Sequence, residues 1–149
     1  MPKKIIPVSV AKAQEWITNC LGFSLGDKTP TQKGNTRYDL NHKLPIAESF
    51  LQKLSELGYE LPRQISSLEE ANENEFILMV FDFSEFKEYY PFVGELYFWD
   101  YHVVRRELDK TWVHKPGWHK PPCEICCEAD WEGIYEEFGR EYVLFAFAE

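Results

Sequence analysis

Two histidines and two cysteines around residue 120 have the residue types and the spacing of a metal site. They are separated by steps of five, four and three residues: His114, His119, Cys123 and Cys126. Zinc is held in proteins by four nitrogen or sulfur ligands at the corners of a tetrahedron. Prolines on both sides of His119 bend the chain, so one loop could gather these four side chains. The sequence therefore allows a zinc site here, and we expect no other cofactor.

The same stretch allows two other interpretations. Cys123 and Cys126 form a Cys-x-x-Cys pair, which in a reducing compartment is either redox-active or half of a zinc site. Glu124 and Glu128 flank the thiols and disfavour the thiolate that redox chemistry requires. In the second interpretation Cys126 or Cys127 packs as a small apolar side chain and both histidines lie at the surface. The spacing matches no established zinc pattern, so the sequence leaves these alternatives open.

A third chemistry would use the histidines and cysteines between residues 102 and 127. The segment 102–120 carries five basic and two acidic side chains, so it is the part of the chain best suited to a phosphate group. A small hydrolase or nuclease is therefore an alternative function. No nucleophile elbow, phosphate-binding loop or dinucleotide fingerprint accompanies these residues. Natural sheets also place charges of this kind on hairpin edges, which explains them without a site.

The acidic stretch that follows carries more information about function. Between residues 124 and 141 there are seven acids and one base, Arg140. Glu136 and Glu137 lie near the end of an expected helix, where its dipole disfavours negative charge. Such placement indicates a use other than helix stability. We predict a partner-binding surface that consists of Glu128, Asp130, Trp131, Glu132, Tyr135, Glu136 and Glu137.

The charge of the whole chain favours a basic protein as the partner. Residues 1–67 carry nine bases and six acids, whereas residues 68–149 carry seven bases and nineteen acids. The second part therefore has a net charge of −12 within a total of −9. An acidic field repels nucleic acid and steers cationic proteins. This profile is similar in kind, without a shared motif, to that of small acidic inhibitors of nucleases, including bacterial immunity proteins.

We therefore predict a small acidic binding protein, not an enzyme, that neutralises or regulates a basic partner without binding nucleic acid directly. A zinc-stabilised adaptor is a further alternative. The 149 residues form one globular domain in this prediction, since no linker or repeat divides residues 1–149. No apolar run approaches a membrane span or a signal peptide. We expect no membrane contact and a cytoplasmic location, where the four cysteines stay reduced.

Apolar spacing and helix caps give the elements of the first half. Ser9 precedes a helical pattern over residues 10–21, and Gly22 would end this helix. Residues 24–43 have the composition of a long surface loop. A second helix begins at Pro45 and ends before Gly58. Ser67 and Glu70 then fit a capping box.

The second half has mostly the pattern of strands. We expect a central strand over residues 75–83, a connection over 84–92, a strand over 94–104, a hairpin over 105–115 and a last strand over 141–148. A short helix capped by Asp130 precedes that last strand. The predicted fold class is α+β, with N-terminal helices packed on one face of a mostly antiparallel sheet and one late short helix. The predicted core includes Trp16, Phe50, Leu54, Ile77, Met79, Phe81 and Leu144.

Overall fold

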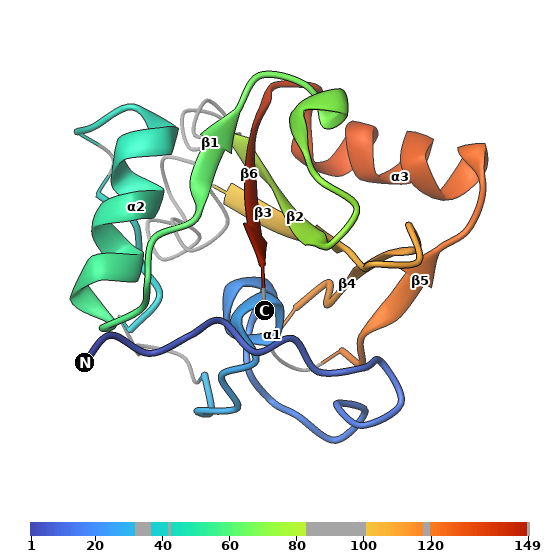
Figure 1. Cartoon of the computed structure of the whole chain (residues 1–149). Helices are drawn as coiled ribbons and strands as arrows, with labels where there is room; N and C mark the ends of the chain where they lie inside the picture. The colour runs from blue at the N-terminus through green and yellow to red at the C-terminus, as the bar shows by residue number, and fades with distance from the viewer. Residues whose placement is uncertain (32–36, 42, 83–100, 118–119, 149) are drawn as a thin grey trace, which may run out of the picture.

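The computed structural model describes residues 1–31, 37–41, 43–82, 101–117 and 120–148 (Figure 1). Its helices are α1 (Cys20–Leu25), α2 (Ile46–Glu56) and α3 (Glu128–Phe138), with a 3₁₀ turn η1 (Leu68–Glu70). Its strands are β1 (Arg63–Ile65), β2 (Glu75–Asp82), β3 (Tyr101–Arg106), β4 (Trp112–His114), β5 (Cys123–Ile125) and β6 (Tyr142–Ala148). They form one sheet in the order β1-β6-β2-β3-β4-β5, and every neighbouring pair is antiparallel. In the described ranges, no helix has the length and apolar character to cross a bilayer.

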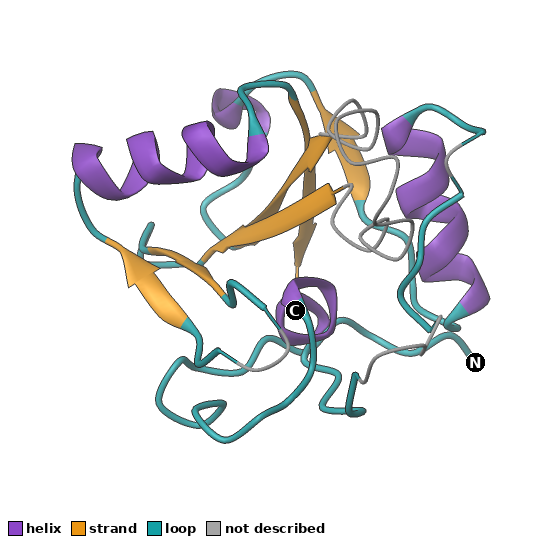
Figure 2. Cartoon of the chain, turned by 180° about the vertical axis from the view of Figure 1, so that it is seen from behind, coloured by secondary structure: helices purple, strands orange, loops and turns teal. Residues whose placement is uncertain are grey.

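Both faces of the sheet are covered, by different helices. Strand residues alternate between the faces, so Phe76, Leu78 and Val80 join α1 and α2 in one apolar cluster. Ile77 and Met79 point the other way and pack with α3. Figures 1 and 2 show α2 and α3 on opposite sides of the sheet. The predicted α+β class is confirmed: the N-terminal helices cover one face, and the late helix covers the other.

The first helix lies further along the chain than predicted. Residues 10–15 form turns, and α1 begins at Cys20, because the Asn19 side chain accepts a hydrogen bond from the Gly22 N–H at 2.9 Å. Gly26 ends the helix with a φ of 75°, and a Cβ at this position would lie 1.8 Å from the Ile6 carbonyl oxygen. The prediction that Gly22 ends a helix over residues 10–21 was therefore wrong. An asparagine cap and an obligatory glycine define the helix instead.

The prediction of a surface loop over residues 24–43 was wrong in part: Ser24 and Leu25 belong to α1, and Tyr38 and Leu40 are buried because they pack in the core with α1 and α2. Most other elements agree with their patterns. The α2 helix, the capping box at Ser67, the central strand, the 105–115 hairpin and the last strand are all present. The late helix has Cys127 as its N-cap, so the prediction of Asp130 as the cap was wrong. The Asp130 carboxylate still accepts a hydrogen bond from the Cys126 N–H at 2.9 Å. The predicted connection 84–92, and the first part of the strand 94–104, fall outside the described residues.

The predicted core is confirmed except at one position. Phe50, Leu54, Ile77, Met79, Phe81 and Leu144 are buried. Trp16 is half-buried and packs in a small separate cluster with Ala13, Phe23 and Val113. The turns at 10–15 explain the difference, because they place Trp16 at the margin of the sheet.

Truncation of either large side chain of α2 is expected to cost about 2–5 kcal/mol of unfolding free energy. Phe50 stacks on Phe145 with ring centroids 4.9 Å apart, and both Phe50 and Leu54 are fully buried. Phe50→Ala and Leu54→Ala therefore lose transfer free energy and leave a cavity. Urea titration measures the loss, with Gln52→Ala on the exposed side of the same helix as the control. A loss below about 1 kcal/mol in both variants would show that α2 does not pack in this way.

Candidate functional site

The residues predicted to bind a partner lie on the outer side of α3. All five acids are exposed: Glu128, Asp130, Glu132, Glu136 and Glu137. Ile134 and Phe138 are buried beneath them, and Trp131 and Tyr135 are half-buried between the two sides. The sequence pattern thus described the helix faces correctly.

Helical spacing divides these acids into two groups. Successive residues turn by about 100°, so residues four apart share one side of the helix. Glu128, Glu132 and Glu136 therefore form a row, and this row runs beside Trp131 and Tyr135. We call these five residues the α3 strip. Asp130 and Glu137 lie on the other flank of the helix and do not belong to it.

The aromatic side of the strip continues into the sheet. The Trp131 ring lies 5.4 Å from Trp112 of β4 and 5.9 Å from Tyr135, measured between centroids. Tyr135 lies 6.2 Å from Phe81, and Phe81 lies 5.5 Å from Tyr142 of β6. Tyr142 is 44% exposed. These contacts hold the half-exposed rings in fixed positions, as binding anchors require.

The chain itself places a guanidinium on the strip. Arg140 lies over the Tyr135 ring at 4.5 Å and donates a hydrogen bond to the Glu132 carboxylate at 3.0 Å. Both charged side chains are more than half exposed, so this pair contributes little to stability. Glu128 and Glu136 have no ion-pair partner in the part of the chain that the structure describes. The Glu132 carboxylate and the Tyr135 ring therefore already bind one arginine of the chain itself. The carboxylates of Glu128 and Glu136 stay available to a partner.

No protein family, curated protein or solved structure matches this chain. Its function is inferred from its own side chains.

The two described histidines form a buried pair under α3. His102 Nε2 lies 2.8 Å from His114 Nδ1, and the His102 ring stacks on Phe138 at 3.9 Å. Burial, and secondarily the charge of its neighbour, holds the pKa of His102 well below its usual range. Burial lowers the pKa of His114 to about 4, against an opposing effect of Asp130. Both rings are therefore neutral at pH 7, and the interpretation that placed His114 at the surface was wrong.

Three of the four predicted metal ligands lie within the described residues. His114 and Cys123 face each other across β4 and β5, and Cys126 follows directly after β5. Cys123, Cys126 and Cys127 are all exposed, free thiols, so the interpretation in which Cys126 or Cys127 packs as a small apolar side chain was wrong. Desolvation and nearby carboxylates raise the thiol pKa values of Cys123 and Cys126, which keeps them protonated. His119 falls outside the described residues.

His114, Cys123 and Cys126 do not form a complete metal site or catalytic site among the described residues. Among the side chains that the structure describes, no group of three or more histidine, cysteine or acidic residues is placed to hold an ion. No hydrogen bond joins Cys123 to His114 in the same residues, so a nucleophile and its base are not yet paired. The zinc site and the hydrolase both stay predictions. Metal analysis of protein purified with zinc present tests the first of them.

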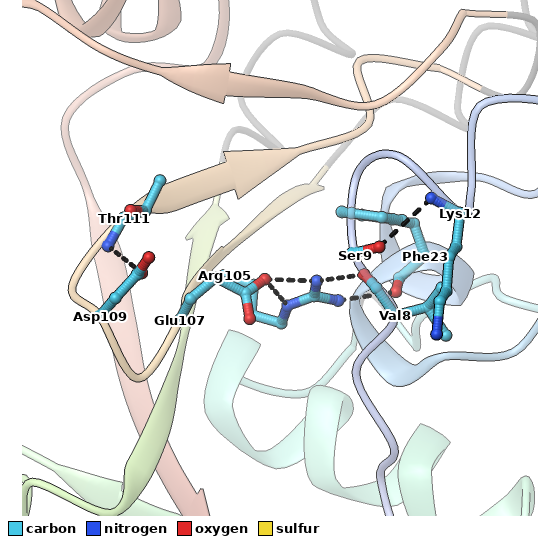
Figure 3. Close-up of polar contacts among 8 residues, drawn as sticks. All are labelled: Val8, Ser9, Lys12, Phe23, Arg105, Glu107, Asp109 and Thr111. Atoms are coloured by element: carbon cyan, nitrogen blue, oxygen red, sulfur yellow. Dashed lines mark hydrogen bonds and ion pairs between the residues drawn. The ribbon is translucent and has the colours of Figure 1, made fainter.

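Two bases of the segment 102–120 face inward. Arg105 is fully buried: its guanidinium donates to the Val8 carbonyl at 2.7 Å, to the Phe23 carbonyl at 3.0 Å and to Glu107 (Figure 3). It also lies over the Phe23 ring at 4.6 Å. Lys115 is buried as well and donates to the Gly117 carbonyl. Arg105 therefore attaches the N-terminal segment to the sheet, a role that its charge alone did not indicate.

Acidification is expected to destabilise the fold through the histidine pair. An unfolded histidine binds a proton near pH 6.5, whereas folded His114 does so only near pH 4. The unfolded state therefore binds more protons between these values, and stability falls as the pH decreases through this window. His114 alone should cost about 2 kcal/mol between pH 7.5 and pH 5.

Urea unfolding at the two pH values measures this loss. Most carboxylates are still ionised at pH 5, so their titration contributes little over this range. His114→Gln, which retains a hydrogen-bond donor, should remove its share of the pH dependence. Equal unfolding free energies of the natural protein at pH 7.5 and pH 5 would contradict a buried neutral pair.

Proposed function

We propose that this protein binds a basic protein partner through the α3 strip and neutralises or regulates it by covering a cationic surface. The observation that carries this proposal is the row of exposed Glu128, Glu132 and Glu136 beside the fixed rings of Trp131 and Tyr135. A solvated helix face requires neither fixed aromatic rings nor acids against its dipole. No basic residue is present in the last turn of α3 to offset Glu136 and Glu137.

The arrangement suits arginine in particular. A guanidinium can stack on an aromatic ring and donate to a carboxylate at the same time, which an ammonium does less well. Arg140 makes this double contact with Tyr135 and Glu132. An arginine of the partner would repeat this geometry further along the row. Rings provide buried contact area, and the carboxylates provide specificity and fast encounter.

The class of partner follows from this charge. Proteins that handle nucleic acid, nucleases among them, present arginine-rich clefts that an acidic helix can occupy. The same carboxylates repel nucleic acid, so we propose no direct contact with it. Membrane contact and a catalytic role form no part of the proposal, and the cytoplasm is the proposed location.

Capture of partners at low salt tests the proposal when three forms of the protein are compared. The strip variant is Glu132→Lys with Glu136→Lys, and the matched control is Glu48→Lys with Glu60→Lys on and beside α2. All four positions are exposed, and each pair of reversals changes the net charge from −9 to −5. The same basic protein should be retained by the natural form and the control and lost from the strip variant. Equal retention by all three forms would refute the α3 strip as the binding surface.

A further inference from the structure

A second candidate site lies away from the α3 strip. An open hollow of about 400 Å³ is lined by residues of η1 and the segment after it, by the end of β3 and by the 107–111 turn. It opens on the same face of the sheet that α3 covers, since Ala71 in its wall packs against that cluster. Figure 1 shows the green segment between β1 and β2, which contains η1, passing near α3 before it enters the start of β2.

Arg106 is the unusual member of this hollow. It is half-buried, and its Nε is shielded from solvent without a hydrogen-bond partner. No residue in the described ranges forms an ion pair with its guanidinium. Its neighbour Arg105 has every contact that a buried arginine requires. Shielded guanidinium N–H groups without partners are costly, and their best partner is a planar carboxylate bound through two parallel hydrogen bonds.

The other charged side chains of the hollow limit the net charge of the ligand. Glu75 is already engaged by Arg63, through hydrogen bonds of 2.6 and 3.1 Å. Glu69 and Glu73 then balance Arg106 and Lys110. Glu69 also accepts a hydrogen bond from the Ser67 side chain. Two exposed acids beside two bases favour a ligand that is neutral overall, with one positive and one negative group. A phosphate dianion would be repelled by the two glutamates.

Three apolar side chains interrupt the otherwise polar lining of the hollow: Leu68, Ala71 and Leu108. Leu68 of η1 is 37% exposed, and Leu108 of the turn is 44% exposed, and both line the hollow. Exposed leucines from two separate segments around one hollow indicate contact with an apolar group. Asp109 fixes the turn by accepting a hydrogen bond from the Thr111 N–H at 3.0 Å, so Leu108 is held in place.

We propose that this hollow binds a free α-amino acid with an apolar side chain. Its carboxylate pairs with the Arg106 guanidinium, its ammonium group with Glu69 or Glu73, and its side chain lies between Leu68 and Leu108. The site is independent of the proposed partner surface on α3.

Calorimetric titration with L-leucine tests the proposal. The expected result is saturable binding with a Kd of about 1 mM or tighter. Two analogues separate the contributions: 4-methylpentanoate lacks the ammonium group, and 3-methylbutylamine lacks the carboxylate. Both should bind about tenfold more weakly, because each loses a charge-assisted hydrogen bond. Inorganic phosphate should not compete.

Variants complete the experiment. Arg106→Gln should weaken leucine binding by about tenfold or more, whereas Arg140→Gln, on the α3 strip, should leave it unchanged. Leu108→Lys alters the wall without touching Arg106 and should also weaken binding, which keeps the test decisive if Arg106→Gln folds poorly. The proposal is overturned by the absence of saturable leucine binding, by equal binding of 4-methylpentanoate or phosphate, or by leucine binding that survives in both site variants.

Discussion

Replacing Arg105 with alanine is expected to lower the unfolding free energy by about 3–5 kcal/mol. The guanidinium is fully buried and donates to two backbone carbonyls, of Val8 and Phe23, and to the Glu107 carboxylate. Its removal leaves these acceptors without a donor and removes the stacking on Phe23. The N-terminal segment should then detach before the sheet unfolds, because Arg105 joins the two.

Urea unfolding and limited proteolysis of the N-terminal segment measure these two effects. Arg105→Lys keeps the positive charge but loses the planar guanidinium with its several N–H donors. Its unfolding free energy should therefore lie between those of the natural protein and Arg105→Ala. Arg106→Ala is the matched control, since this side chain follows on the same strand and has no described partner; it should cost less than about 1 kcal/mol. Similar losses for Arg105→Ala and Arg106→Ala would show that the buried contacts do not stabilise the fold.

The central and last strands and the later helices could be predicted from sequence because their patterns are local, whereas β1 and β5, of three residues each, were not predicted because they are too short to show a pattern. The apolar run of β2, the capping box at Ser67 and the apolar face of α3 each lie within about ten residues. The start of α1 could not be predicted from periodicity, since a regular apolar spacing after Ser9 competed with the Asn19 cap. In the fold the Asn19 side chain caps α1. The apolar residues after Ser9 form turns instead of a helix, and they pack against Phe23 and Val113.

Part of the candidate site could also be predicted, because that part depends on a local sequence pattern. The acids and rings of α3 belong to one helix, so their exposure follows from its period. The ring contacts with Trp112 and Tyr142 depend on which strands are neighbours, which single-sequence patterns do not contain. Arg105 and Arg106 are adjacent and have the composition of a charged hairpin edge. Because successive strand residues point to opposite faces of the sheet, Arg105 lies in the core and Arg106 lines the hollow.

Reversal of two charges of the α3 strip is expected to slow association with the partner by about tenfold or more at low salt. Glu132→Lys and Glu136→Lys replace attraction by repulsion on the encounter surface. The variant should fold normally, because a lysine at position 136 improves the fit to the helix dipole and Glu132 contributes only an exposed ion pair. The control, Glu48→Lys with Glu60→Lys, should associate at nearly the natural rate. Circular dichroism and urea unfolding confirm that both variants fold.

Truncation of the rings should act on dissociation instead. Tyr135→Ala removes the ring that carries Arg140 and leaves the acids in place, so the complex should dissociate faster with little change in the association rate. Arg140→Ala vacates the Glu132 and Tyr135 contacts and should slow dissociation, since a second partner arginine can then bind there in addition to the one further along the row.

The association rate as a function of ionic strength, measured by stopped flow with the captured partner, tests the central claim most directly. Screening shortens the Debye length from about 30 Å at 0.01 M to about 10 Å at 0.1 M salt. The natural protein and the α2 control should therefore associate much more slowly at 0.1 M, whereas the strip variant should be slow at low salt and lose this dependence. A rate of the natural protein that does not change with salt, or a strip variant that follows the natural curve, would contradict binding through the acids of α3.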